Sequence, residues 1–72
     1  MSLTDEQRDL VARKIRVETI LKQKALAKRR MGKKLSLIEI RRIKRPRAQI
    51  IRIGFEKARE EDETIPEFEK ER

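Results

Sequence analysis

The chain has 72 residues and a formal net charge of +8 at pH 7, and 47% of its residues are charged. A chain of this length forms one small domain with a modest core, which needs a brace such as a bound partner or self-association. Because the sequence contains neither Cys nor His, it excludes disulfide frameworks, the usual zinc, iron–sulfur and haem sites, and catalysis by a Cys or His side chain.

The N-terminal segment, MSLTDEQRDL, lacks a long apolar run. We therefore expect neither a secretory signal nor a membrane span, and an intracellular protein of the cytoplasm or nucleoid, or of the nucleus if the cell is eukaryotic. Thr4 and Gln7 have the spacing of a capping box, which predicts that a helix starts there. No Gly or Pro follows until Gly32, so the first helix is predicted to run from about Asp5 to about Met31.

This first helix is predicted to have a broad apolar face made of two adjacent stripes. The first stripe contains Leu10, Val17, Leu21 and Ala25, and the second contains Val11, Ile15 and Leu26. The following helices are expected to cover part of the face, and a second copy of the chain is expected to cover another part. Lys14, Lys24 and Lys28 interrupt a sustained heptad seam, so a compact dimer is favoured over a long coiled coil.

Two shorter helices are predicted after Gly32. Ser36 and Glu39 form a second capping box, and Leu35 and Ile40 have the spacing of a hydrophobic staple. This second helix must end before Pro46, which suits the first turn of a third helix from about Pro46 to about Glu61. The Ile-rich segments LSLIEIRRI and AQIIRIGF also permit strands, but the capping signals and the helical spacing of the apolar residues favour helices.

The C-terminal segment is acidic. Thr64 and Glu67 again match a capping box, which predicts a final helical turn that carries Phe68. The predicted organisation is one all-α domain of three helices over residues 1–61, followed by an acidic charged tail over residues 62–72.

Positive charge is concentrated in the middle of the chain. Residues 13–53 contain sixteen Lys or Arg and two acidic residues, whereas residues 54–72 contain four basic and eight acidic residues. A few basic residues at the end of the first helix are expected there because they complement the helix dipole. The rest lack local acids and would repel one another, so they indicate a polyanionic partner. The candidate site residues are Lys28, Arg29, Arg30, Lys33, Lys34, Arg41, Arg42, Lys44, Arg45 and Arg47.

Nucleic acid is the partner that this pattern favours. Arg and Lys side chains, and the amides at the start of the second helix, suit phosphate groups. Phe55 and Phe68 are the sole aromatic residues and are expected to pack internally, so recognition by base stacking is disfavoured and duplex DNA or structured RNA is favoured. A helix-turn-helix at Gly32 or at Pro46 fits the pattern poorly, although Gln49, Arg52 and Arg59 could reach a groove from the third helix.

Other function classes are less well supported. The run of carboxylates EEDE over residues 60–63 lacks a nucleophile or phosphate loop, so we expect no enzyme activity and no cofactor. A membrane-surface role is disfavoured because the apolar face lacks Trp. The basic clusters also resemble a nuclear-localisation pattern, which is too common to assign a location. The main alternative is a helical interaction or assembly subunit whose basic patch binds an acidic protein surface.

Overall fold

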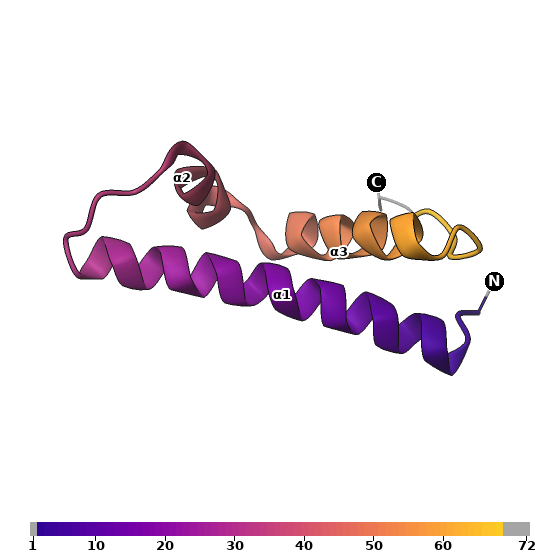
Figure 1. Ribbon diagram of the computed structural model, residues 1–72. Helices are drawn as coiled ribbons and strands as arrows, with labels where there is room; N and C mark the ends of the chain where they lie inside the picture. Colours follow the sequence, from indigo (N-terminus) through magenta and orange to yellow (C-terminus); the bar gives the residue numbers. More distant parts are fainter. Residues whose placement is uncertain (1, 69–72) are drawn as a thin grey trace.

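The computed structural model describes residues 2–68, and these residues form three helices without strands. The helices are α1 (Asp5–Arg30), α2 (Leu37–Lys44) and α3 (Arg47–Glu61). Their order, long, short and medium, confirms the predicted all-α fold (Figure 1). The alternative that the Ile-rich segments form strands is wrong, since both segments are largely helical.

Local sequence signals set the helix boundaries. The Thr4 hydroxyl accepts from the Gln7 amide while the Gln7 side chain accepts from the Thr4 amide, and Ser36 and Glu39 repeat this reciprocal pair before α2. Helix α1 ends one residue earlier than predicted, because Met31 is its C-cap. Pro46, predicted to be the first residue of the third helix, is instead the N-cap of α3.

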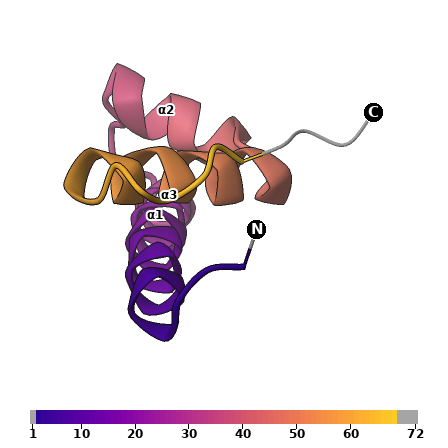
Figure 2. The same ribbon diagram turned by 90° about the vertical axis from the view of Figure 1, so that its right-hand side faces the viewer.

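Helices α2 and α3 both lie on the same side of α1 and pack on α1 rather than on each other (Figures 1 and 2). Ile50, Gly54 and Ala58 are the buried residues of α3. Gly54 permits the close approach of the two helices, since a Cβ atom there would collide with Cγ1 of Ile15. The opposite side of α1 is left uncovered, as Figure 1 shows.

The core is small and lies between the N-terminal half of α1 and α3. Val11, Ala58 and Ile65 form its buried centre, and Leu3, Leu10, Ile15 and Phe55 pack against it. Ile65 is the one large side chain that is fully buried among the described residues. The packed unit therefore continues past Glu61, the predicted end of the helical domain, and takes in the first part of the acidic tail.

The predicted final helical turn at Thr64–Glu67 is wrong. The Thr64 amide and hydroxyl both donate to the Asp62 carboxylate, and the Ile65 amide donates to the Asp62 carbonyl, so this segment forms a turn. Phe68 packs on Phe55 with ring centroids 5.1 Å apart, in agreement with the expected internal role of both aromatic residues. Residues 69–72, the rest of the predicted tail, lie outside the described residues.

The apolar face of α1 differs from the predicted one. Val17, expected in the first stripe, is 51% exposed, while the neighbouring Glu18 is only 4% exposed. The buried positions of α1 are Val11, Glu18 and Ala25, each seven residues from the next. A carboxylate therefore occupies the middle of the buried stripe. No helix among the described residues is long and apolar enough to cross a membrane.

Candidate nucleic-acid interface

The turn after α1 has a defined geometry that carries two candidate lysines. The Lys33 amide donates to the Lys28 carbonyl and the Gly32 amide donates to the Arg29 carbonyl, each at 3.0 Å, which is the hydrogen-bond pattern of a Schellman motif. Gly32 has φ 74°, a left-handed conformation that costs glycine little. The motif directs the chain away from α1, so Lys33 and Lys34 are exposed at the end of the molecule.

The start of α2 is occupied by a carboxylate of the protein itself. Glu39 accepts from the Ser36 amide at 2.9 Å and from Nζ of Lys28 at 3.0 Å. These hydrogen bonds lower the pKa of Glu39 to about 2, and the bond from the Ser36 amide contributes more than the bond from Lys28. The predicted use of this helix end as a phosphate site is therefore weakened, because Glu39 already places negative charge there.

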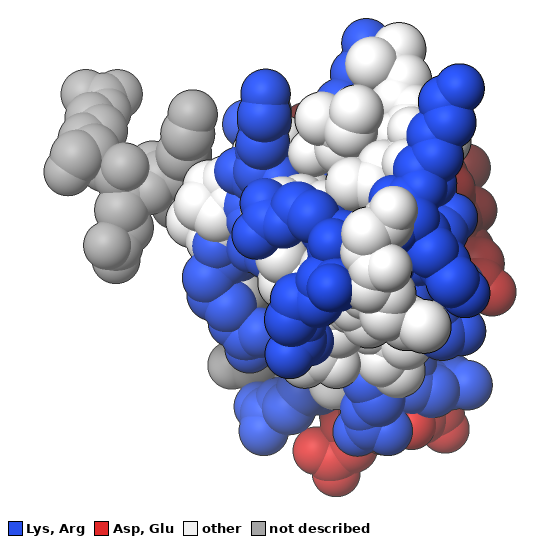
Figure 3. Space-filling model, turned by 90° about the vertical axis from the view of Figure 1, so that its left-hand side faces the viewer, with Lys and Arg blue, Asp and Glu red and all other residues white. Residues whose placement is uncertain are grey.

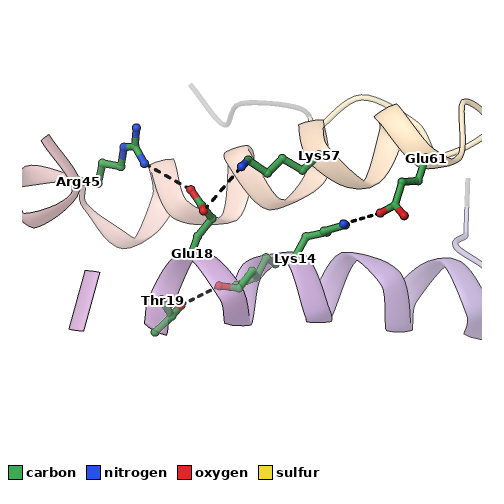
Figure 4. Close-up of polar contacts among 7 residues, drawn as sticks. Lys14, Glu18, Thr19, Arg45, Lys57 and Glu61 are labelled. Carbon is green, nitrogen blue, oxygen red and sulfur yellow. Dashed lines mark hydrogen bonds and ion pairs between the residues drawn. The ribbon is translucent and has the colours of Figure 1, made fainter. Parts of the chain in front are cut away.

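A buried ion-pair cluster fixes the junction between α2 and α3. Arg45 Nη1 lies 3.3 Å from Glu18 Oε1, and Lys57 Nζ lies 3.9 Å from Glu18 Oε2 (Figure 4). Lys22 Nζ donates to the Arg45 carbonyl at 2.6 Å. The Arg45 side chain is 21% exposed. Glu18 and Lys22 of α1 thus hold both the side chain and the backbone of Arg45, directly before Pro46.

A second set of polar contacts holds the far end of α3 against α1. Lys14 Nζ lies 2.5 Å from Glu61 Oε2 (Figure 4), and Nε2 of the Gln7 side chain donates to the Thr64 hydroxyl at 2.7 Å. These contacts place the acidic residues after α3 beside the N-terminal half of α1. Along the long axis of the protein, the acidic segment and the Gly32 turn therefore lie at opposite ends (Figure 1).

The ten candidate residues fall into three groups. Lys28 and Arg45 have carboxylate partners inside the chain. Arg42 is half-buried, and its Nε is buried without a hydrogen-bond partner among the described residues. The other seven are exposed and form no ion pair within residues 2–68; they are Arg29, Arg30, Lys33, Lys34, Arg41, Lys44 and Arg47.

Six of these exposed cations lie on the last turn of α1, the Gly32 turn and α2, at one end of the molecule. Arg47 lies at the start of α3, where it lines a hollow with Ala12, Ile15, Arg16 and Thr19 of α1. Figure 3, which views the Gly32 end, shows Lys and Arg side chains over much of this surface, with acidic side chains towards its edges. A shallow hollow between α2 and α3 is lined by Arg41, Lys44, Arg45 and Gln49. Uncharged surface lies between the cations in Figure 3, and the exposed large apolar residues of this part of the chain are Met31, Leu37, Ile38 and Ile40. We call the seven exposed cations the basic end.

The expected groove readers on the third helix are partly engaged elsewhere. Arg59 Nε donates to the Ile65 carbonyl at 3.0 Å and Nη1 lies 3.6 Å from Glu67, so this side chain holds the C-terminal turn. Arg52 pairs with Glu56 at 3.4 Å. Since α2 and α3 do not pack on each other, the helix-turn-helix arrangement considered around Pro46 is not formed.

Sequence reasoning missed the residues that position the basic end. Glu18 and Lys22 hold Arg45, and Glu39 pairs with Lys28 across the α1–α2 contact. A signal for Glu18 was available, because Glu18 lies seven residues from both Val11 and Ala25 and therefore on the same helical stripe. The pairing of Lys28 with Glu39 has no equivalent signal, since it depends on how the chain returns after Gly32.

The chain was compared with protein-family models, curated proteins and solved structures, and none of the three comparisons gives a match. No group of three or more acidic side chains within residues 2–68 is arranged to hold a metal ion. A functional assignment must therefore be argued from the charges and contacts of this chain alone.

Proposed function

We propose that this protein binds the phosphate backbone of duplex DNA or structured RNA through the basic end, without catalysis, as an intracellular accessory or regulatory protein. The observation that carries the proposal is the concentration of seven exposed cations, unpaired within residues 2–68, around the Gly32 and Pro46 turns. Their mutual repulsion opposes folding until an anion neutralises it.

Charge segregation strengthens this proposal. Glu61 at the end of α3 and Asp62 after it are tied to the N-terminal half of α1 through Lys14 and Gln7, so among the described residues they do not neutralise the basic end. A polyphosphate that approaches the Gly32 end meets cations before it meets carboxylates. Such contacts supply affinity and little sequence preference.

Arg45 and Lys28 have structural roles in this proposal. Arg45 keeps α2 and α3 in place through Glu18, and Lys28 keeps α2 on α1 through Glu39. The predicted set of ten contacts is thereby reduced to seven exposed cations, and Arg42 is half-buried. Its buried Nε is without a hydrogen-bond partner in residues 2–68.

The test is a titration of a labelled duplex and a structured RNA at several salt concentrations. If about seven phosphates are neutralised, the slope of log K against log salt is about −6. A slope near zero, or no binding at low salt, contradicts the proposal.

Matched variants test the location of the site. Reversing Lys33 and Lys34 to Glu, or Arg41 and Lys44 to Glu, should weaken binding about tenfold more than reversing Arg8 and Arg52. Each pair changes the net charge equally, and all six side chains are exposed. Equal effects of all three pairs would mean that binding follows net charge and that the basic end is not a site.

A second candidate function is an assembly subunit that binds an acidic protein surface. The observation that favours it is the exposure of apolar side chains between the cations, since Leu37 is 66% and Ile38 44% exposed. Replacing both with Ser should leave phosphate binding unchanged, whereas binding to an acidic amphipathic peptide requires them. The two candidates are separated by this pair of measurements.

A further inference from the structure

The uncovered side of α1 carries a strip of residues that alternate in spacing by three and four. We call this set the outer strip; it comprises Arg13, Val17, Ile20, Lys24, Ala27 and Met31. Val17 is 51%, Ile20 41% and Met31 68% exposed. Helices α2 and α3 lie on the opposite side of α1 (Figures 1 and 2). This spacing is that of a short helix-pairing seam.

We infer that the outer strip pairs antiparallel with the outer strip of a second copy of this chain. The buried core of the single chain is small, with Ile65 as the one large side chain that is fully buried within residues 2–68, and a domain of this size gains stability from a second copy. Pairing would also remove Val17 and Ile20 from water. The inference is independent of nucleic acid and concerns the state of the free protein.

The charges along α1 determine the direction of pairing. The first turn of α1 contains Asp5 and Glu6, whereas the last turn contains Lys28, Arg29 and Arg30. A parallel pair would place the two basic ends side by side and cause repulsion. An antiparallel pair places the acidic start of each α1 beside the basic end of the other, which is the favourable arrangement.

The apolar residues also fit an antiparallel register. If the two-fold axis passes between Glu18 and Thr19, Val17 of one copy packs on Ile20 of the other. Flanking positions then bring Asp9 of each copy next to Arg30 of the second copy, twice by symmetry. Arg13 lies opposite Lys24 of the second copy, where the two positive charges repel each other, but both side chains are long enough to bend towards water. Asp9, 3.9 Å from Arg13 in the same chain, reduces that repulsion.

This register also predicts how the dimer binds a duplex, and that prediction rests on the proposed function. Gly32 lies about 13–14 residues from the two-fold axis, so the two Gly32 turns are about 40 Å apart along α1 at ~1.5 Å per residue. That spacing is slightly longer than one turn of B-DNA, about 34–36 Å. A duplex of about 20 base pairs should therefore bind more tightly than one of about 8 base pairs by more than the statistical number of sites.

The test of the dimer is sedimentation equilibrium of the full chain without nucleic acid. We expect twice the chain mass of 8.7 kDa, and a single-chain mass for Ile20→Glu with unchanged helical circular dichroism, since Ile20 is 41% exposed. A wild-type chain of single mass at high micromolar concentration overturns the inference, whatever the result of the nucleic-acid titration. A dimer without nucleic-acid binding overturns the proposed function and leaves the inference intact.

Two variants with the same charge change test the direction of pairing. Arg30→Glu places two carboxylates together and should weaken the dimer roughly three- to tenfold, whereas Lys24→Glu creates a pair with Arg13 of the second copy and should tighten it by a similar factor. Asp9→Arg combined with Arg30→Asp should restore the dimer that each change weakens alone. Shifts of Arg30→Glu and Lys24→Glu in the same direction, or no restoration, contradict the antiparallel arrangement.

Discussion

Replacing Glu18 with Gln should destabilise the protein by about 2 kcal/mol. Breaking a fully buried ion pair costs about 3–5 kcal/mol, but the Arg45 side chain is 21% and the Lys57 side chain 49% exposed, so water compensates part of the loss. For a domain of this size, about 2 kcal/mol lowers Tm by roughly 8–16 °C. The measurement is thermal unfolding followed by circular dichroism, at one fixed protein concentration because self-association would shift Tm.

A double-mutant cycle separates the two partners of Glu18. Arg45 lies at 3.3 Å and Lys57 at 3.9 Å from the carboxylate. Combining Glu18→Gln with Arg45→Gln should give a coupling free energy of about 1–2 kcal/mol, while the cycle with Lys57→Gln should give below about 0.5 kcal/mol. A loss smaller than about 0.5 kcal/mol for Glu18→Gln, or equal coupling to both partners, refutes the view that Glu18 holds the α2–α3 junction through Arg45.

Two further substitutions test local contacts. The folded-state pKa of Glu39 is about 2, below its ordinary 4.5, so the stability that the Glu39 carboxylate contributes is complete above about pH 4.5 and is lost as the pH falls towards 2. The Tm difference between the wild type and Glu39→Gln should therefore be constant above about pH 5 and shrink towards zero near pH 2. A pH-independent difference contradicts this role. Gly54→Ala should lower Tm because its Cβ collides with Ile15, and overpacking of about 1–3 kcal/mol exceeds the ~1 kcal/mol gain in helix propensity; a raised Tm would show that Ile15 relaxes easily.

Local signals predicted the parts of the fold that depend on a few consecutive residues. The capping boxes at Thr4 and Ser36 and the left-handed Gly32 each act within one turn, so their effect can be read without knowing the tertiary structure. The same pattern failed at Thr64, where the hydroxyl donates to the Asp62 carboxylate and Nε2 of the Gln7 side chain donates to that hydroxyl. Burial of Ile65 favours this turn over a helix.

The sequence predicted which cations belong to the candidate site, but it did not predict which of them pair with carboxylates of the same chain. Lys28 and Arg45 look identical to the other cations in the sequence, and only the return of α2 and α3 onto α1 brings Glu39 and Glu18 to them. Part of the broad apolar face predicted for the first helix is buried and part is exposed, because the packing of α3 on α1 buries Val11 but leaves Val17 exposed. Tertiary placement therefore decides which residues of a predicted set remain at the surface.

The segregation of charge along α1 connects the two proposals and makes them compete at Arg30. In the antiparallel dimer, this side chain lies beside Asp9 of the second copy, yet it also belongs to the basic end proposed to contact phosphate. If phosphate takes Arg30 from Asp9, binding weakens the dimer, and by thermodynamic reciprocity the dimer weakens phosphate binding at that contact. If the two contacts are compatible, a duplex that spans both basic ends strengthens the dimer instead. The sign of this coupling follows from comparing the dimer mass in the presence of short and long duplexes, because only a long duplex reaches both ends.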